Sequence, residues 1–443
     1  MTRSGLTIPA GVALTLLLTQ GSARGQGGQL LTLAQARRLA LTRYETVQAA
    51  REQVDQARLL RQQASSAVLP HAEITSLTTR NFITTAFQFG DRRIDVLPGF
   101  DYNIALTISQ PIFAGLRDRK VRDQANLGID VAGRQLELTA QDAALEATRA
   151  YYQLLSAEEN VEISRRAVAV AEETLRVADS LYRAGEAVET AVLRARVAGS
   201  EARRELLQAE NGRTLAQQGL SLLIGATDAF IVARPPRPTE DGQPLEALVA
   251  IGVKSRADMK ALNLQHQVAE LEIEKRRGQH FPVISAEGSY VRRRASFPSN
   301  QLSSVQVRAT WTLFDGGRTG IDVAAARSQL RQIDDRRELL RKQIEQQIRA
   351  AYLTIDTLGA SADMLTAQVE FARKNAESTA RAYRAGEATD LDVMEANQVL
   401  TRSERQLSVT AFSLDVARYE LQRAVGTLPA EIGGTNSAEG AQE

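Results

Sequence analysis

The sequence predicts a mainly α chain with a small transmembrane β part, built as a tandem duplication of long helical hairpins plus four strands. Three observations predict this fold. Several short sequence landmarks in the first half of the chain recur in the same order in the second half. Proline-free segments extend much further than the helices of ordinary globular proteins. Short segments between them alternate apolar and polar residues, as strands do.

The duplication is visible in three pairs of landmarks. They are, first copy then second, Tyr182–Ala187 and Tyr383–Ala388, Ser109–Gly115 and Thr310–Gly316, and Leu69–Pro70 and Phe281–Pro282. The first two pairs are 201 residues apart and the third is 212 apart. The first copy therefore contains extra residues between its proline and its second landmark. An ordered set of matches at nearly one offset indicates a repeat.

Each copy is expected to contain a helix, a β-hairpin and a long helical hairpin. The expected ranges in the first copy (24–224) are 31–66 for the helix, 71–113 for the β-hairpin and 118–224 for the helical hairpin. In the second copy (244–426) they are 244–279, 283–314 and 319–426. Residues 225–243 read as a linker or collar segment, and 427–443 as a flexible tail.

The predicted strands have one apolar and one polar face. In the first copy the apolar positions are Phe100, Tyr102, Ile104, Leu106 and Ile108, and in the second they are Val305, Val307, Ala309, Trp311 and Leu313. Strands of about ten residues with this pattern are typical of a membrane barrel around a wet lumen. An edge strand of a soluble sandwich has the same alternation, so a single segment does not decide between them.

The long helices carry a sevenfold pattern that indicates coiled-coil packing. In the last helix large residues recur at Val393, Leu400, Leu407, Leu414 and Leu421. Small residues follow each of them by three positions, which lets neighbouring helix backbones approach closely. The first copy has an alanine row at the same spacing. Because alanine also favours helices by itself, the alanine row has an alternative explanation in helix propensity.

Composition excludes several classes of function. Lys plus Arg is 54 and Asp plus Glu is 53, so no net field favours nucleic acid. The chain has no cysteine, and its three histidines, at 71, 266 and 280, have no metal-ligand spacing. No glycine-rich phosphate loop or triad is found. We therefore expect no enzyme, no cofactor and no metal site.

The first 23 residues read as a secretory signal peptide. Arg3 supplies the positive start, 6–18 is mostly apolar, and Gly21–Ala23 offers small residues for cleavage. A bilayer-spanning helix needs about 20 apolar residues, and no segment reaches that length. The mature protein is thus expected to be exported, with any membrane contact made by its strands.

Four strands per chain cannot close a barrel, since about eight are the minimum for small barrels. Open sheet edges are not tolerated in lipid. The chain is therefore expected to pool its strands with other copies of itself.

These features together resemble the TolC-like outer-membrane efflux protein family. The residues that carry the resemblance are Leu31–Ala36, Pro70, Ser109–Phe113, Arg256–Met259, Leu313–Arg318 and Ala385–Val393. The resemblance covers about residues 30–426. It implies a homotrimer anchored by twelve strands in outer-membrane lipid, with a long periplasmic part. It also implies docking onto a periplasmic adaptor and an inner-membrane pump in a tripartite efflux system.

The resemblance assigns roles to the two helical turns. The expected adaptor-docking tips are Gly185, Glu186, Gly386, Glu387 and Thr389. The glycines suit a left-handed helix end, and Thr389 resembles the first residue of a capping box, so both positions have a structural explanation as well.

The expected periplasmic pore constriction consists of Asp392, Glu395 and Tyr383. Asp392 and Glu395 match acidic positions of the family, and three chains would give two carboxylate rings that favour cations. Two positions depart from the family. Ala191 stands where an acid commonly meets the tyrosine, and Ala388 replaces a basic residue. Nearby Glu189 is the candidate replacement for that acid.

Two alternatives remain open at this point. Type I secretion of a polypeptide uses the same kind of tunnel. A periplasmic coiled-coil structural or adaptor protein would also contain long helices, although an adaptor should carry a lipoyl-like β domain in place of amphipathic hairpins.

Overall fold

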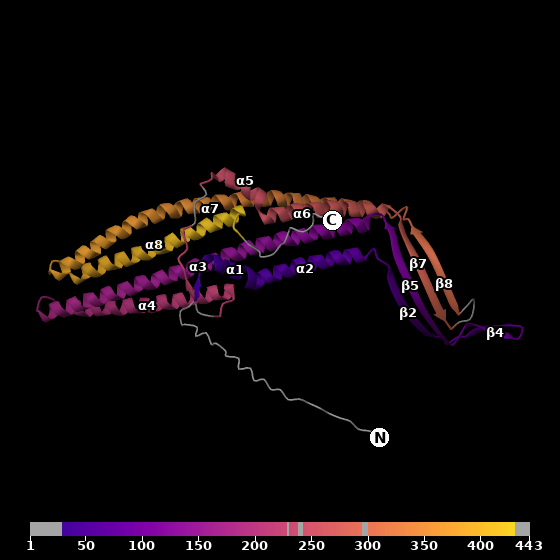
Figure 1. Cartoon of the computed structure of the whole chain (residues 1–443), viewed down its shortest axis with the longest axis horizontal. Coiled ribbons are helices and arrows are strands. Elements are labelled where there is room, and N and C mark those ends of the chain that lie inside the picture. Colours follow the sequence, from indigo (N-terminus) through magenta and orange to yellow (C-terminus); the bar gives the residue numbers. More distant parts are fainter. Residues whose placement is uncertain (1–28, 228–229, 238–241, 295–299, 430–443) are drawn as a thin grey trace, which may run out of the picture.

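The computed structural model describes residues 29–227, 230–237, 242–294 and 300–429. The predicted signal peptide, 1–23, lies outside these ranges, as do most of the predicted tail and parts of the linker. The molecule is elongated: helices run along its length, and a sheet bends away at one end (Figure 1).

The helical body contains two sets of four helices. The first set is α1 (Leu33–Arg43), α2 (Glu45–Ser66), α3 (Arg117–Arg183) and α4 (Glu189–Ile224). The second set is α5 (Leu245–Ser255), α6 (Ala257–Arg277), α7 (Arg318–Arg384) and α8 (Asp390–Val425), with a 3-10 turn, η1, at Gly278–His280. α3 and α7 each have 67 residues, and α4 and α8 each have 36. A helix of 67 residues is about 100 Å long.

The short helices that open each copy are broken, where the sequence suggested continuous ones. α1 gives way to α2 at Tyr44, and α5 gives way to α6 at Arg256, and both residues have extended ψ angles. Arg256 is buried and donates to Asp258 and Gln347 at 2.6 Å each, and to the carbonyl oxygen of Ala424. The break thus places a charged side chain where it ties α6 to α7 and α8.

Four antiparallel strands form the main sheet in the order β2-β5-β7-β8. They are β2 (His71–Arg80), β5 (Phe100–Ala114), β7 (Val283–Arg293) and β8 (Gln301–Thr310). β1 (Gln29–Leu31) pairs in parallel with β6 (Phe230–Val232) beside the helical body. β3 (Thr85–Phe89) and β4 (Arg92–Leu97) form a separate hairpin between β2 and β5.

The second β-hairpin is shorter than the alternation suggested, because β8 ends at Thr310 and not near Leu313. Thr310 pairs with Val283, the first residue of β7, so no partner strand lies beyond it. Trp311 instead donates its indole N–H to the carbonyl oxygen of His280 at 2.9 Å. β5 reaches Ala114 because it can pair with Val283 from the other side.

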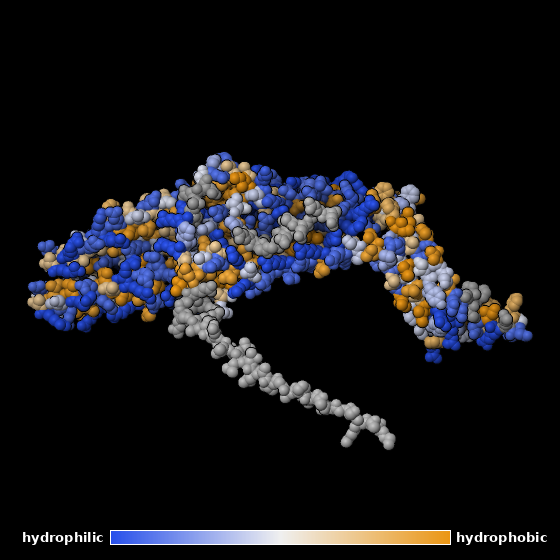
Figure 2. All heavy atoms as spheres, viewed as in Figure 1, coloured by the Kyte–Doolittle hydropathy of each residue, from blue (hydrophilic) through white to orange (hydrophobic). Residues whose placement is uncertain are grey.

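The sheet has one apolar and one polar face. Residues opposite one another in an antiparallel ladder share a face. One such row is Ala72, Ile108, Gly288 and Val305, and the adjacent row on the other face is Glu73, Thr107, Ser289 and Ser304. Figure 2 shows hydrophobic residues gathered on the visible side of the sheet, mostly near the helices.

Glycines form the bend between helices and strands. Gly115 has φ +64°, and a Cβ there would clash with the backbone of Gly278. In the second copy Gly316 and Gly317 have φ +69° and +87° just before α7. Positive φ values are accessible to glycine without strain. The two copies therefore turn from strand to long helix through the same left-handed backbone.

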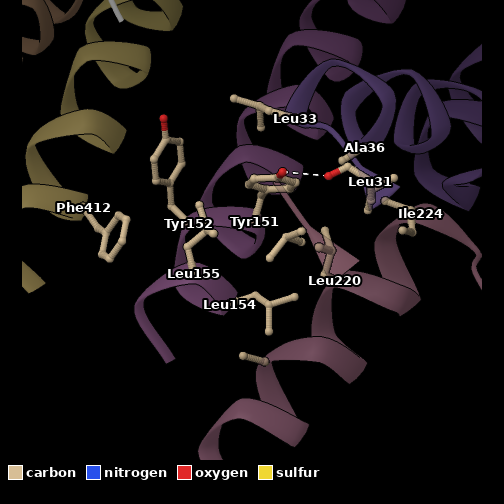
Figure 3. Packing of buried hydrophobic residues seen from close by; sticks show 12 residues of the cluster. Leu31, Leu33, Ala36, Tyr151, Tyr152, Leu154, Leu155, Leu220, Ile224 and Phe412 are labelled. Carbon is tan, nitrogen blue, oxygen red and sulfur yellow. Dashed lines mark hydrogen bonds between the residues drawn. The ribbon is translucent and has the colours of Figure 1, made fainter. Parts of the chain in front are cut away.

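The main apolar core lies midway along the helical body, where α1, α3, α4 and the linker meet (Figure 3). The Tyr151 hydroxyl donates to the carbonyl oxygens of Leu31 at 2.8 Å and Ala233 at 2.5 Å. Tyr151 and Tyr152 are almost fully buried, and Tyr152 packs against Phe412 of α8. This cluster joins the two repeats. Among the helices of the described ranges, none is both long and apolar enough to span a membrane.

Candidate functional site

The candidate site lies at the two turns α3–α4 and α7–α8, at the end of the molecule opposite the sheet (Figure 1). Gly185 has φ +79° and Gly386 has φ +75°. In each turn the residue after the glycine donates its N–H back to the helix, Glu186 to Leu181 and Glu387 to Ala382, both at 2.9 Å. These bonds satisfy carbonyl groups at the helix end. The two tips therefore share one backbone geometry.

The predicted docking residues lie at the surface of these tips. Gly185, Glu186, Gly386, Glu387 and Thr389 are all exposed. Each turn thus presents an exposed glutamate directly after its glycine and an exposed arginine, Arg183 or Arg384, two residues before it. Their position at the far end of the long helices leaves them accessible to another protein.

Thr389 and Asp392 form a reciprocal cap at the start of α8. The Thr389 N–H and hydroxyl donate to the Asp392 carboxylate at 2.9 and 2.7 Å, and the Asp392 N–H donates to the Thr389 hydroxyl at 3.3 Å. The hydroxyl and N–H of Thr389 lower the pKa of Asp392, which keeps it ionised. Asp392 is nevertheless exposed, as is Glu395 one turn further on. Spacing of three places both carboxylates on one side of α8.

Tyr383 is placed differently from the two acids. It lies in the last turn of α7 with only 6% of its surface exposed. Its hydroxyl is buried and finds no hydrogen-bond partner among the described residues. Burial, and then the negative charge of Asp390, raise the pKa of Tyr383. Tyr383 therefore packs inside the tip, while Asp392 and Glu395 face outward in the single chain.

An ion pair that sequence reasoning missed joins the two tips. Arg194 of α4 donates to both carboxylate oxygens of Asp390 on α8, at 2.8 and 3.0 Å. The Asp390 side chain is only 8% exposed, whereas that of Arg194 is 50% exposed. Two parallel bonds from a guanidinium to a carboxylate fix geometry as well as adding energy. Ala191, where the resemblance led us to expect an acid, is buried in the first turn of α4.

Further ion pairs connect the helical hairpins along their length. They are Arg166–Glu404, Arg405–Glu205, Arg149–Glu420 and Arg423–Asp142, with N–O distances of 2.6 to 3.1 Å. Each pair is worth little by itself when exposed. As a row they hold α8 against α3 and α4 in one register. The hairpins therefore form one body from the core to the tips.

The described residues show no metal chemistry. In the ranges given above, no three His, Cys, Asp or Glu side chains lie together in a way that could hold a metal ion.

Comparison with known proteins shows which family has a matching sequence. The sequence model of the family described as "Outer membrane efflux protein" matches residues 36–226 and 253–427. The chain is 22% identical over 409 residues to the alkaline protease secretion protein AprF of Pseudomonas aeruginosa, covering 88% of this chain and 83% of AprF. It is 21% identical over 350 residues to the outer membrane efflux protein BepC of Brucella suis, covering 77% of this chain and 76% of BepC.

The fold also matches a solved structure. The outer membrane protein VceC of Vibrio cholerae superposes with a TM-score of 0.72 at 18% identity, covering 89% of this chain and 96% of VceC. This match confirms the mainly helical fold with four antiparallel strands. The family match confirms the predicted non-enzymatic channel function and the outer-membrane location. TolC-like channels are homotrimers. The chain belongs to the outer membrane efflux protein family, the TolC-like channels of the outer membrane.

Proposed function

We propose that three copies of this chain form one channel, which receives cargo from a periplasmic adaptor and an inner-membrane pump and releases it outside the cell. The observation that carries the proposal is the main sheet, in which the outer strands β2 and β8 each pair with only one strand of the described part of the chain. Such edges are not stable in lipid. Pairing β2 of one copy with β8 of the next closes three sheets into twelve strands.

The helical hairpins support the same assembly. α3 and α4 in one copy of the repeat are as long as α7 and α8 in the other. Three chains therefore supply six equivalent hairpins, which suits a hollow tube with near sixfold symmetry. The sheet end lies in the outer membrane and the tips reach into the periplasm.

The tips are proposed to dock onto the adaptor. Gly185 and Gly386 give both turns the same shape, so one adaptor surface can fit either turn. Glu186 and Glu387 are exposed at matching positions and suit a basic partner. Thr389 stabilises the start of α8, which holds the second turn in place.

The constriction is proposed to consist of two rings of carboxylates. Asp392 and Glu395 are exposed on one side of α8 in the single chain, and threefold symmetry would place three of each around the tunnel. Tyr383 belongs to the same tip but is buried in the last turn of α7 in the single chain. Close carboxylates attract cations and slow the passage of anions.

Site-specific photo-crosslinking tests the docking proposal. A photoreactive amino acid at Glu387 is expected to give an adduct with the adaptor in cells. The same amino acid at Glu338, an exposed position of α7 far from the tip, is the matched control and should give none. Equal adduct formation at both positions, or none at Glu387 in a trimer of normal abundance, would contradict tip docking.

Secretion of a polypeptide is a second candidate, and the likeness to AprF favours it. The tunnel of long helices suits an unfolded chain as well as a small solute. Deletion of the gene distinguishes polypeptide secretion from solute efflux, if both the set of secreted proteins and the sensitivity of the cells to toxic solutes are measured. Loss of one secreted protein with unchanged sensitivity would favour secretion over solute efflux.

A further inference from the structure

The β3–β4 hairpin is amphipathic and belongs to the first repeat. Phe87 pairs with Ile94, and Phe89 lies two residues further along the same face, opposite Arg92. Gln88 pairs with Arg93 on the opposite face. Phe89 is 84% exposed and Phe87 is 63% exposed. An isolated two-stranded hairpin is marginally stable in water, so an uncovered aromatic face needs a partner.

The base of the hairpin is fixed to the sheet. Asn81 donates its backbone N–H to Gly99 and its side-chain amide to Pro98, both at 2.9 Å. A Cβ on Gly99 would lie 3.3 Å from the Thr84 side chain. These contacts clamp the two chain segments that lead into β3 and out of β4. The hairpin therefore extends beyond β2 and β5 in a defined direction (Figure 1).

Lipid is not the partner, because the main sheet already spans the membrane. Ten residues of β2 extend about 33 Å, and a tilt of about 40° reduces this to about 25 Å along the membrane normal. The apolar band of outer-membrane barrels is about 25 Å tall. The hairpin follows β2 and so lies outside the hydrocarbon region, where its phenylalanines meet no acyl chains.

Other copies of the hairpin are within reach. Twelve strands spaced by about 4.8 Å and tilted by about 40° enclose a barrel of roughly 12 Å radius. A five-residue strand such as β3 extends about 17 Å, which exceeds that radius. Because the hairpin follows edge strand β2, it lies next to the protomer boundary. Three copies are therefore long enough to meet near the axis.

We propose that the β3–β4 hairpins of the three protomers pack their Phe87 and Phe89 faces against one another and narrow the outer mouth of the channel. The proposal rests on the trimer described above. It assigns the extra residues of the first repeat to an interaction surface whose partner is the same surface of the neighbouring copies. Gln88 and Arg93 then face water, and Arg93 is paired with Asp95 at 3.1 Å.

The lack of cysteine makes the test direct, since a single introduced thiol is unique in the chain. Purified trimers of Phe89→Cys are treated with a mild oxidant and with a short bis-maleimide. A threefold arrangement allows one link per trimer, so up to about two thirds of the chains should form covalent dimers. Gln88→Cys, one residue away on the opposite face, is the matched control and should remain unlinked. Phe87→Cys repeats the test if Phe89→Cys assembles poorly.

Two further readouts decide the outcome. Single-channel conductance of the Phe87→Ser, Phe89→Ser variant should rise, and that of Gln88→Ser should not. Intact trimers in which Phe89→Cys links no better than Gln88→Cys would overturn the proposal. Quenching of a label at Phe89→Cys by a lipid-soluble quencher would overturn it as well, by showing a lipid contact. Absence of trimers before any linking would instead refute the assembly itself.

Discussion

Arg194 on α4 and Asp390 on α8 are joined by two hydrogen-bonded contacts of 2.8 and 3.0 Å, which link the tips of the two helical hairpins within one protomer. Asp390 is nearly buried, so its charge is compensated mainly by Arg194. The position equivalent to Arg194 in the second repeat is Glu395, 201 residues later. The two tips thus have the same backbone conformation, but this position is positively charged in the first repeat and negatively charged in the second.

Reversing one charge of this pair should loosen the tip. Arg194→Asp places two carboxylates together, which should remove about 2 kcal/mol of attraction and add repulsion. Higher basal conductance in planar bilayers is the expected result. The double reversal Arg194→Asp, Asp390→Arg should restore the conductance. If the single variant conducts like the wild type, other contacts hold the tips together.

Neutralising the two exposed acids should change ion selectivity. The Asp392→Asn, Glu395→Gln variant removes six charges from a trimer, so its reversal potential in a salt gradient should shift away from cation preference. Thr389→Ala is the matched control, because it weakens the helix cap by about 1 kcal/mol and leaves both charges in place. An unshifted potential in the double variant would leave Asp392 with its capping role alone.

A side chain at Gly386 should impair export more than assembly. Valine at φ +75° is strained by about 1 to 2 kcal/mol, and relief of that strain changes the shape of the tip. Gly359→Val is the control, because Gly359 lies within α7 and a Cβ built on it meets no other atom within 4 Å. Export and trimer yield measured together distinguish the two sites. Normal export by Gly386→Val trimers would show that the turn does not carry the docking contact.

The junction of α6 with α3 should weaken in acid. Burial by itself would raise the pKa of Glu272, but hydrogen bonds from Gln124, Lys275 and Arg276 lower it to about 2. Because the folded pKa lies below the unfolded value, this contribution is fully present above about pH 4.5 and is lost as the pH falls toward 2. Because Glu272 is partly exposed, its contribution to the free energy of unfolding is on the order of 1 kcal/mol.

Thermal unfolding of wild type and Glu272→Gln between pH 6 and pH 3 checks this expectation. The variant should be less stable at pH 6, and the difference should shrink as the pH falls. A difference that stays constant with pH would show that Glu272 acts through packing and not through its charge.

The repeat explains why the fold was predictable from the sequence. Landmarks such as the glycines of the two tips recur at one offset, and proline-free segments leave few alternatives to α3 and α7. The alternation of apolar and polar residues identified β5 and β8 but predicted too long a β8. Trp311 continues the alternation, but the partner strand of β8, β7, begins at Val283, which pairs with Thr310. The end of a strand depends on its neighbour, which the local pattern does not contain.

The contacts between repeats were not predictable in the same way. Arg194 and Asp390 are 196 residues apart, and each sits among many other charged residues. Repeat symmetry would have suggested like residues at like positions, whereas this pair depends on their difference. The β3–β4 hairpin was likewise visible only as extra residues. Its short strands have no counterpart among the described residues between β7 and β8 to guide an assignment.

The mass of the native particle tests the central claim most directly, because the whole account depends on sharing strands between copies. Native mass spectrometry of the detergent-solubilised protein from outer membranes should give three times the mass of the mature chain. Weakening the shared edge, for example with proline at Thr75 in β2, should lower that population. A particle with the mass of a single chain, in detergent that preserves the fold, would contradict the account.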